Sequence, residues 1–120
     1  MMPAGENLGV KMTLPFGEIT PREYQALREA GQAPRLIDVR EPHEYQFVRI
    51  EGAELKPLSQ IQQWWQTLDP DEEYVFQCHS GYRSAQVCMM LSRAGFTHLK
   101  NLTGGIDRWA VDVDPTMRRY

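Results

Sequence analysis

Short runs with a strand pattern alternate with amphipathic segments along most of this chain. Three short runs bounded by turn-forming residues predict strands: residues 35–39, 74–77 and 97–102. Four segments with apolar positions at helical spacing predict helices: residues 19–31, 59–70, 83–95 and 104–113. Because strands and helices alternate over short connections, the pattern predicts an α/β fold with a central, mostly parallel sheet and helices on both faces.

Start and stop signals are clearest for the first of these helices. Thr20 is a suitable N-cap, and Glu23 completes a capping box with it. Pro21 at the first helical position and Gly31 after the last turn are residue types that begin and end helices. We therefore expect a short helix between Thr20 and Gly31.

The second helical segment, residues 59–70, predicts an amphipathic helix of about two to three turns that begins with Ser59 as N-cap. Its Trp64 and Trp65 are interpreted as packing residues rather than as a ligand platform. Ahead of it, residues 50–58 predict a loop and a short edge strand. The polar residues 40–45 are assigned neither a helix nor a strand.

The composition is that of one ordinary globular domain, with 120 residues, 42% of them hydrophobic and 24% charged. Residues 1–17 have few periodic apolar positions, so we expect an N-terminal arm ahead of a domain at residues 18–120. The net charge of −3 argues against a nucleic-acid partner. Because no apolar run approaches the ~18 residues of a membrane helix and the N-terminus does not resemble a leader, we expect a cytoplasmic protein without a membrane partner.

Cysteine and histidine spacing argues against a metal site and against a disulfide framework. The two cysteines, Cys78 and Cys88, lack the spacing of zinc ligands, and the three histidines are scattered along the chain. We therefore expect free thiols, no bound metal and no organic cofactor.

The segment CHSGYRS places a cysteine between a predicted strand and a predicted helix. In a parallel sheet, sites form beyond the carboxyl ends of the strands, and Cys78 occupies that position. Gly81 can adopt backbone angles that other residues avoid, so successive N–H groups and the helix N-terminus predict an anion-stabilising nest. The predicted anion-binding loop comprises Cys78, His79, Ser80, Gly81, Tyr82, Arg83 and Ser84.

Such a nest makes a nucleophile of its cysteine. Helix N-termini and nearby cations lower a thiol pKa from ~8.5 toward ~3.5–7.5, so we expect Cys78 to be largely thiolate. The fork of Arg83 suits an oxyanion substrate, while His79 and Tyr82 either shape access or are simply exposed. The alternative is an inert, packed cysteine, an interpretation that suits Cys88 on the apolar face of the following helix.

Three blocks resemble the rhodanese family of sulfurtransferases, and the resemblance covers residues 18–115. LIDVREPHEY is similar to the family's strand and acidic turn, CHSGYRS to its active-site loop, and NLTGGIDRW to its late Gly-Gly signature. The resemblance implies a small three-layer rhodanese-like fold. It also implies that Cys78 carries sulfur as a persulfide and that Arg83 closes the loop.

The resemblance assigns a supporting role to Asp38 and Arg40, which brace the loop from the neighbouring strand. A carboxylate at Asp38 is expected to accept N–H bonds from the loop or to pair with Arg83. The alternative for Asp38 is a strand-end cap without a catalytic role.

Loop length separates the chemistries that the resemblance allows. Cys78 through Arg83 is six residues, which in the family fits a sulfane sulfur, whereas phosphatase and arsenate-reductase relatives use a loop one residue longer. The resemblance therefore implies sulfur transfer from a donor such as thiosulfate to cyanide, a thiol or a protein cysteine. A phosphatase or arsenate reductase, and a binding or sulfur-relay module without turnover, are the alternatives.

Two departures from the family pattern lie outside the loop. Val48 and Arg49 replace a usual Gly-His pair, and Val113 stands where glycine is common. They bear on the adjacent turn, on the C-terminal stretch and on the docking of a donor or partner.

Overall fold

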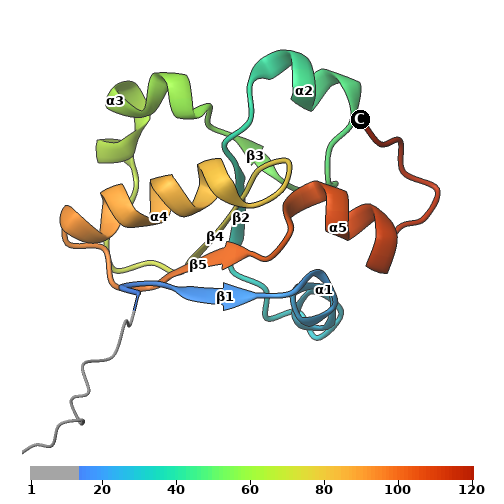
Figure 1. The fold of residues 1–120 in the computed structure, drawn as a ribbon. Helices are drawn as coiled ribbons and strands as arrows, with labels where there is room; N and C mark the ends of the chain where they lie inside the picture. Colours follow the sequence, from blue (N-terminus) through green and yellow to red (C-terminus); the bar gives the residue numbers. More distant parts are fainter. Residues whose placement is uncertain (1–13) are drawn as a thin grey trace, which may run out of the picture.

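A computed structural model describes residues 14–120 and contains one sheet of five parallel strands with helices on both faces (Figure 1). The strand order is β1-β5-β4-β2-β3. The strands are β1 (Gly17–Ile19), β2 (Arg35–Asp38), β3 (Glu54–Leu55), β4 (Tyr74–Gln77) and β5 (Leu99–Leu102). The α-helices are α1 (Pro21–Glu29), α2 (Pro42–Phe47), α3 (Ile61–Trp64), α4 (Tyr82–Arg93) and α5 (Gly105–Asp112). The predicted α/β fold with a parallel sheet is confirmed.

The two faces of the sheet carry separate hydrophobic clusters. On one face, α3 and α4 cover the side chains of Tyr74 and Phe76, which belong to β4. On the other face, α1 and α5 cover Val75 of the same strand. Because β4 lies between β2 and β5 and all of its residues are buried, its carboxyl end is held more firmly than an edge strand would be.

The first helix begins as its sequence signals predict. The Thr20 side chain accepts a hydrogen bond from the Glu23 backbone N–H at 3.1 Å, and the Glu23 carboxylate accepts one from the Thr20 N–H at 2.9 Å. Pro21 is the first helical residue. These contacts satisfy two backbone donors that have no partner within the helix.

Two elements, β1 and α2, were not predicted. The strand β1 is Gly-Glu-Ile, and only Ile19 is buried. It therefore contains no apolar run from which a strand could be predicted. No residue of α2 is buried, and its N-cap is Glu41, a residue type outside the usual N-cap set. Residues 1–13 of the predicted arm lie outside the described residues. The last residue of the arm, Gly17, is the first residue of β1.

The predicted helix over residues 59–70 is confirmed only in part, because residues 58–67 are helical but do not form one regular α-helix. The segment consists of a 3-10 turn (Leu58–Gln60), the single turn of α3 and a second 3-10 turn (Trp65–Thr67). Ser59 is not an N-cap, because it lies inside the first 3-10 turn; its hydroxyl donates to the Glu41 carboxylate at 2.7 Å. The indole N–H of Trp64 donates to the Pro57 carbonyl at 2.8 Å, which ties the segment to the chain before it. Trp64 is buried in the core, as expected.

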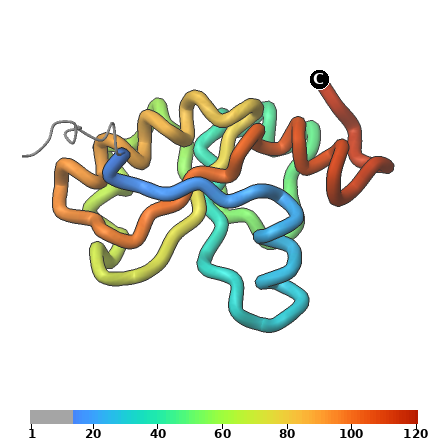
Figure 2. The backbone as a smooth tube through the Cα atoms, turned by 60° about the horizontal axis from the view of Figure 1, so that its bottom comes forward, coloured from blue at the N-terminus to red at the C-terminus, as the bar shows by residue number. Residues whose placement is uncertain are grey.

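None of the helices within residues 14–120 has the length and apolar character needed to cross a membrane. After α5 the chain turns back, and Figures 1 and 2 both show its C-terminus near α2. This placement agrees with an edge-to-face contact between Phe47 and Tyr120, whose ring centroids are 5.9 Å apart.

Substitution of Thr20 by Ala tests the cap of α1. We expect the free energy of unfolding to fall by about 1 kcal/mol, the usual loss for an N-cap hydroxyl. Urea unfolding measures it. Thr97→Ala is the matched control, because Thr97 is exposed between α4 and β5 and caps no helix. Equal losses in the two variants would contradict the assigned cap.

Candidate active site

Cys78 follows β4 directly, at the carboxyl edge of the sheet, and α4 begins at Tyr82. Its Sγ accepts the backbone N–H of Gly81 at 3.1 Å and that of Ser84 at 3.4 Å. The Ser84 hydroxyl also lies 3.4 Å from the sulfur. Gly81 has a left-handed backbone, with φ of +110°, a conformation that residues with a side chain rarely adopt. Two backbone N–H groups thus donate to Sγ at the N-terminus of a helix of 12 residues, while the single hydroxyl proton of Ser84 goes to the Asn101 side chain.

The loop shields its cysteine from open solvent. Only 1% of the Cys78 surface is exposed, whereas 82% of Tyr82 is exposed and Ser80 is exposed as well. His79 is half-buried. A reagent therefore reaches Sγ through the loop rather than across an open surface.

The start of α5 holds the loop through its backbone. The N–H of Ile106 donates to the Cys78 carbonyl at 2.9 Å, and the N–H of Asp107 donates to the His79 carbonyl at 3.0 Å. Gly105 lies so close to this loop that an added Cβ would stand 2.6 Å from the His79 oxygen. The Gly-Gly block of the sequence therefore permits direct contact between two backbones.

Asn101 at the end of β5 supports the loop from a third strand. Its Nδ2 donates to the Gly81 carbonyl at 3.2 Å, and its Oδ1 accepts a hydrogen bond from the Ser84 hydroxyl. Asn101 is buried, so these partners satisfy a side chain that has lost its water. Asn101 is the first residue of the NLTGGIDRW block, but its role was not predicted from the sequence.

Arg83 pairs with Glu44 of α2 rather than with Asp38. The two carboxylate oxygens of Glu44 accept from Nη1 and Nη2 of Arg83 at 2.7 and 2.9 Å, a bidentate geometry. The hydrogen bonds from Arg83 are the main cause that lowers the pKa of Glu44 to about 2, and the same pairing raises the pKa of Arg83. The sequence motif contains Glu44, but α2 was not predicted, so nothing pointed to this partner.

Asp38 and Arg40 form a buried ion pair at the end of β2, and neither side chain is exposed. Asp38 accepts from the backbone N–H and Nε of Arg40 at 3.0 Å and from its Nη2 at 2.7 Å. Burial tends to lower the pKa of Arg40, but the hydrogen bonds and charge of Asp38 outweigh it and raise the pKa. Asp38 thus caps the strand end and orients Arg40, instead of meeting the loop N–H groups or Arg83.

The departures at Val48 and Arg49 are compatible with this arrangement. The carbonyl of Val48 accepts from Nη2 of Arg40 at 2.7 Å, a contact that does not depend on the side chain. The guanidinium of Arg49 lies 4.4 Å from the ring centroid of Tyr45 on α2. Val113 packs against the core cluster that contains Trp109.

Cys88 is a packed residue, as expected. It has no exposed surface and belongs to the core cluster between α4 and the sheet. Burial raises the pKa of its thiol to about 12, which removes it from thiolate chemistry at neutral pH. Within residues 14–120, no three His, Cys, Asp or Glu side chains are grouped so as to hold a metal ion.

Substitution of Gly105 by Ala tests the contact between α5 and the loop. The added methyl would meet the carbonyls of Cys78 and His79, so we expect a loss of about 1–2 kcal/mol from its backbone angle and about 1–3 kcal/mol more from the clash. Gly95→Ala is the matched control, because Gly95 also has positive φ but has no atom within 4 Å of the new methyl. Similar losses of unfolding free energy in the two variants would argue against the contact.

Substitution of Glu44 by Gln tests the ion pair through its pH dependence. The pKa of Glu44 is lowered from 4.5 to about 2, so the pair stabilises the fold above pH 4.5 and loses this effect as the pH falls toward 2. At pH 7 we expect Glu44→Gln to cost about 1–2 kcal/mol, between the values for exposed and buried pairs.

The difference in unfolding free energy between wild type and Glu44→Gln should shrink as the pH falls through that window. Urea titrations at several pH values measure it. Glu54→Gln is the control, because Glu54 also pairs with an arginine at 2.7 Å but both side chains are more than a third exposed. We expect the control to lose only ~0.2–1 kcal/mol at pH 7. A pH-independent difference for Glu44→Gln would contradict the prediction.

Comparison with known proteins shows the family of this chain. The rhodanese-like domain model matches residues 20–112. Probable adenylyltransferase/sulfurtransferase MoeZ of Mycobacterium tuberculosis is 39% identical over 104 residues, which are 85% of this chain, and the match spans only 26% of that protein. Putative sulfurtransferase YtwF of Bacillus subtilis is 38% identical over 98 residues, covering 82% of this chain and 94% of that protein. A rhodanese-related protein from Thermoplasma volcanium superposes with a TM-score of 0.71 at 31% identity, over 82% of this chain and 94% of that one. As its three sequence blocks indicated, the chain belongs to the rhodanese-like family of sulfurtransferases.

Proposed function

We propose that this protein transfers a sulfane sulfur through a persulfide on Cys78. The proposal rests on the position of the Cys78 Sγ, to which two backbone N–H groups of the loop donate at 3.1 and 3.4 Å. Donors in this arrangement stabilise negative charge on a sulfur atom. The six-residue spacing from Cys78 through Arg83 adds support, because in the resemblance it fits one sulfur rather than a tetrahedral oxyanion.

In the first step the Cys78 thiolate attacks the outer sulfur of a donor such as thiosulfate. A bond forms between Sγ and that sulfur, the sulfur–sulfur bond of thiosulfate breaks, and its electron pair leaves with sulfite. The rate follows the rules of thiol–disulfide exchange, in which an available thiolate and a good leaving group govern each displacement. The loop N–H groups are then available to the terminal sulfur of the persulfide.

In the second step a nucleophilic acceptor attacks the terminal sulfur and releases the Cys78 thiolate. Cyanide gives thiocyanate, and a thiol or protein cysteine gives a new persulfide. Both steps are displacements at sulfur, so electrons and atoms balance without a metal or an organic cofactor.

The charge around the loop bears on the choice of donor. Arg83 is neutralised by Glu44, and Arg40 by Asp38, so the loop N–H groups and the N-terminus of α4 supply most of the positive potential for an anionic donor. This limited charge is consistent with a small donor or with sulfur delivered by a protein. The larger relative MoeZ is named as both an adenylyltransferase and a sulfurtransferase. For this chain, a protein thiol is our second candidate for the sulfur acceptor, after a small molecule.

Mass spectrometry after incubation with thiosulfate tests the proposal. We expect one added sulfur on Cys78 in the wild type and none in Cys78→Ser. Cys88→Ala is the control and should keep the adduct, because Cys88 is buried in the core. An unmodified Cys78 with every donor tried, or undiminished sulfur transfer in Cys78→Ser, would refute the persulfide.

Two further assays separate the alternatives. Turnover of an aryl phosphate by the wild type, absent in Cys78→Ser, would favour a phosphatase instead. Persulfide formation without release to cyanide or to a small thiol, but with release to a protein thiol, would assign the chain to a sulfur relay.

A further inference from the structure

Tyr120 lies against the active-site loop although it is far from the loop in sequence. Its ring stacks on that of His79, with centroids 4.2 Å apart and planes inclined by 16°. The Nε2 atom of His79 is buried and has no hydrogen-bond partner among residues 14–120. The stacked Tyr120 ring therefore contacts an imidazole whose Nε2 is not held by a hydrogen bond from the described residues.

The hydroxyl of Tyr120 connects the two ion pairs beside the loop. It accepts from Nη1 of Arg40 at 2.9 Å and donates to Oε2 of Glu44 at 2.8 Å. Glu44 in turn holds Arg83. A continuous path of hydrogen bonds thus runs from the buried end of β2, through Tyr120 and α2, to the arginine that closes the loop.

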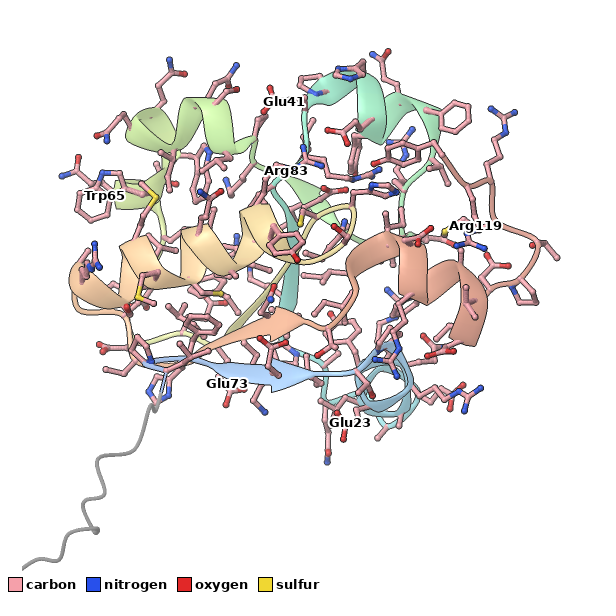
Figure 3. All side chains as sticks on the ribbon, viewed as in Figure 1. Glu23, Glu41, Trp65, Glu73, Arg83 and Arg119 are labelled. Carbon is pink, nitrogen blue, oxygen red and sulfur yellow. The ribbon has the colours of Figure 1, made fainter. Side chains whose placement is uncertain are left out.

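The chain before Tyr120 is anchored by contacts of its own. Arg119 pairs with Asp107 of α5 at 3.0 Å, and the guanidinium of Arg118 lies 5.3 Å from the ring centroid of Phe47. Figure 3 shows Arg119 beside α5 and Arg83 at the start of α4, with the chain returning toward α2 between them. Neither contact uses a Tyr120 side-chain atom, so both remain available to the segment when that side chain is substituted.

We propose that Tyr120 is a positioning residue for the sulfur-transfer site. Its ring holds the loop at His79, and its hydroxyl fixes Glu44 and, through it, the plane of the Arg83 guanidinium. The hydrogen bonds and the stacking contact of Tyr120 go to Arg40, Glu44 and His79 rather than to Sγ, so it acts through its neighbours. The consequence for sulfur transfer rests on the proposed function, whereas the consequence for loop order does not.

Two substitutions separate the ring from the hydroxyl. Tyr120→Phe keeps the stacked ring and removes both hydrogen bonds, and Tyr120→Leu removes the ring as well. The first readout is the rate of Cys78 alkylation by iodoacetamide, a neutral reagent that reacts with the thiolate without transfer of a sulfur atom. We expect Tyr120→Leu to alkylate about 2- to 10-fold faster than wild type, the effect of losing one aromatic pair, and Tyr120→Phe to stay within about twofold, since the pair is retained.

The second readout is the pH profile of the unfolding free energy, which follows the Glu44 carboxyl directly and needs no thiosulfate, a reagent that decomposes in acid. Loss of the hydrogen bond from Tyr120 should raise the pKa of Glu44, so the acid limb of this profile should move to higher pH in Tyr120→Phe by roughly 0.5–1 unit, the size of one hydrogen bond. Tyr45→Phe is the matched control, because it removes a hydroxyl from α2 that donates to the Ala53 carbonyl at 2.7 Å and not to the loop pairs. The acid limb of the control should not move.

The outcomes distinguish this inference from the proposed function. Alkylation rates that change as expected in a protein that forms no persulfide would support the positioning role and refute sulfur transfer. A wild type that forms persulfide, with Tyr120→Leu unchanged in both readouts and folded by thermal unfolding, would overturn the positioning role. So would an acid limb that moves equally in Tyr45→Phe.

Discussion

The hydrogen bonds from the start of α5 to the carbonyls of Cys78 and His79 constrain the rest of the site. These bonds turn the loop carbonyls toward α5, and the opposite face of the loop backbone is left to present N–H groups to the sulfur. The contact requires two backbones to meet, which Gly105 permits because it has no Cβ. Asn101 completes the support from β5. A loop that is already ordered does not need to reorganise when negative charge develops on the sulfur.

The charged groups around the loop are arranged in pairs whose members neutralise each other. Burying a charge without a partner costs several kcal/mol, so the fully buried Arg40 depends on Asp38. Arg83 and Glu44 form a second pair nearer the surface. Because the arginines are occupied, backbone donors and the dipole of α4 remain to stabilise the negative charge that the proposed function requires at Cys78. A loop of this kind suits a singly charged sulfur better than a phosphate dianion.

The parts of the fold that follow from local chemistry were predictable, and the parts set by tertiary contacts were not. The capping box of Thr20 and Glu23, the strand before Cys78 and the helix after it all have clear local signals. By contrast, β1 needs the neighbouring β5 to exist, and α2 buries none of its residues. Because α2 was not predicted, Glu44 was not considered as a partner. The expected partner of Arg83 was therefore the wrong carboxylate, Asp38 instead of Glu44.

Tyr120 shows why sequence motifs identify only some of the residues of a site of this type. No spacing rule connects Tyr120 to His79, because their contact depends on how the chain turns back after α5. Burial of Cys78 to 1% exposure then has two sources: the short loop that surrounds the sulfur, and the neighbours that keep the loop in place. The loop is encoded by six consecutive residues, and its neighbours come from α2, β5, α5 and the C-terminal segment. Under the proposed function, access of a donor or acceptor to Cys78 therefore depends on segments outside the six-residue loop.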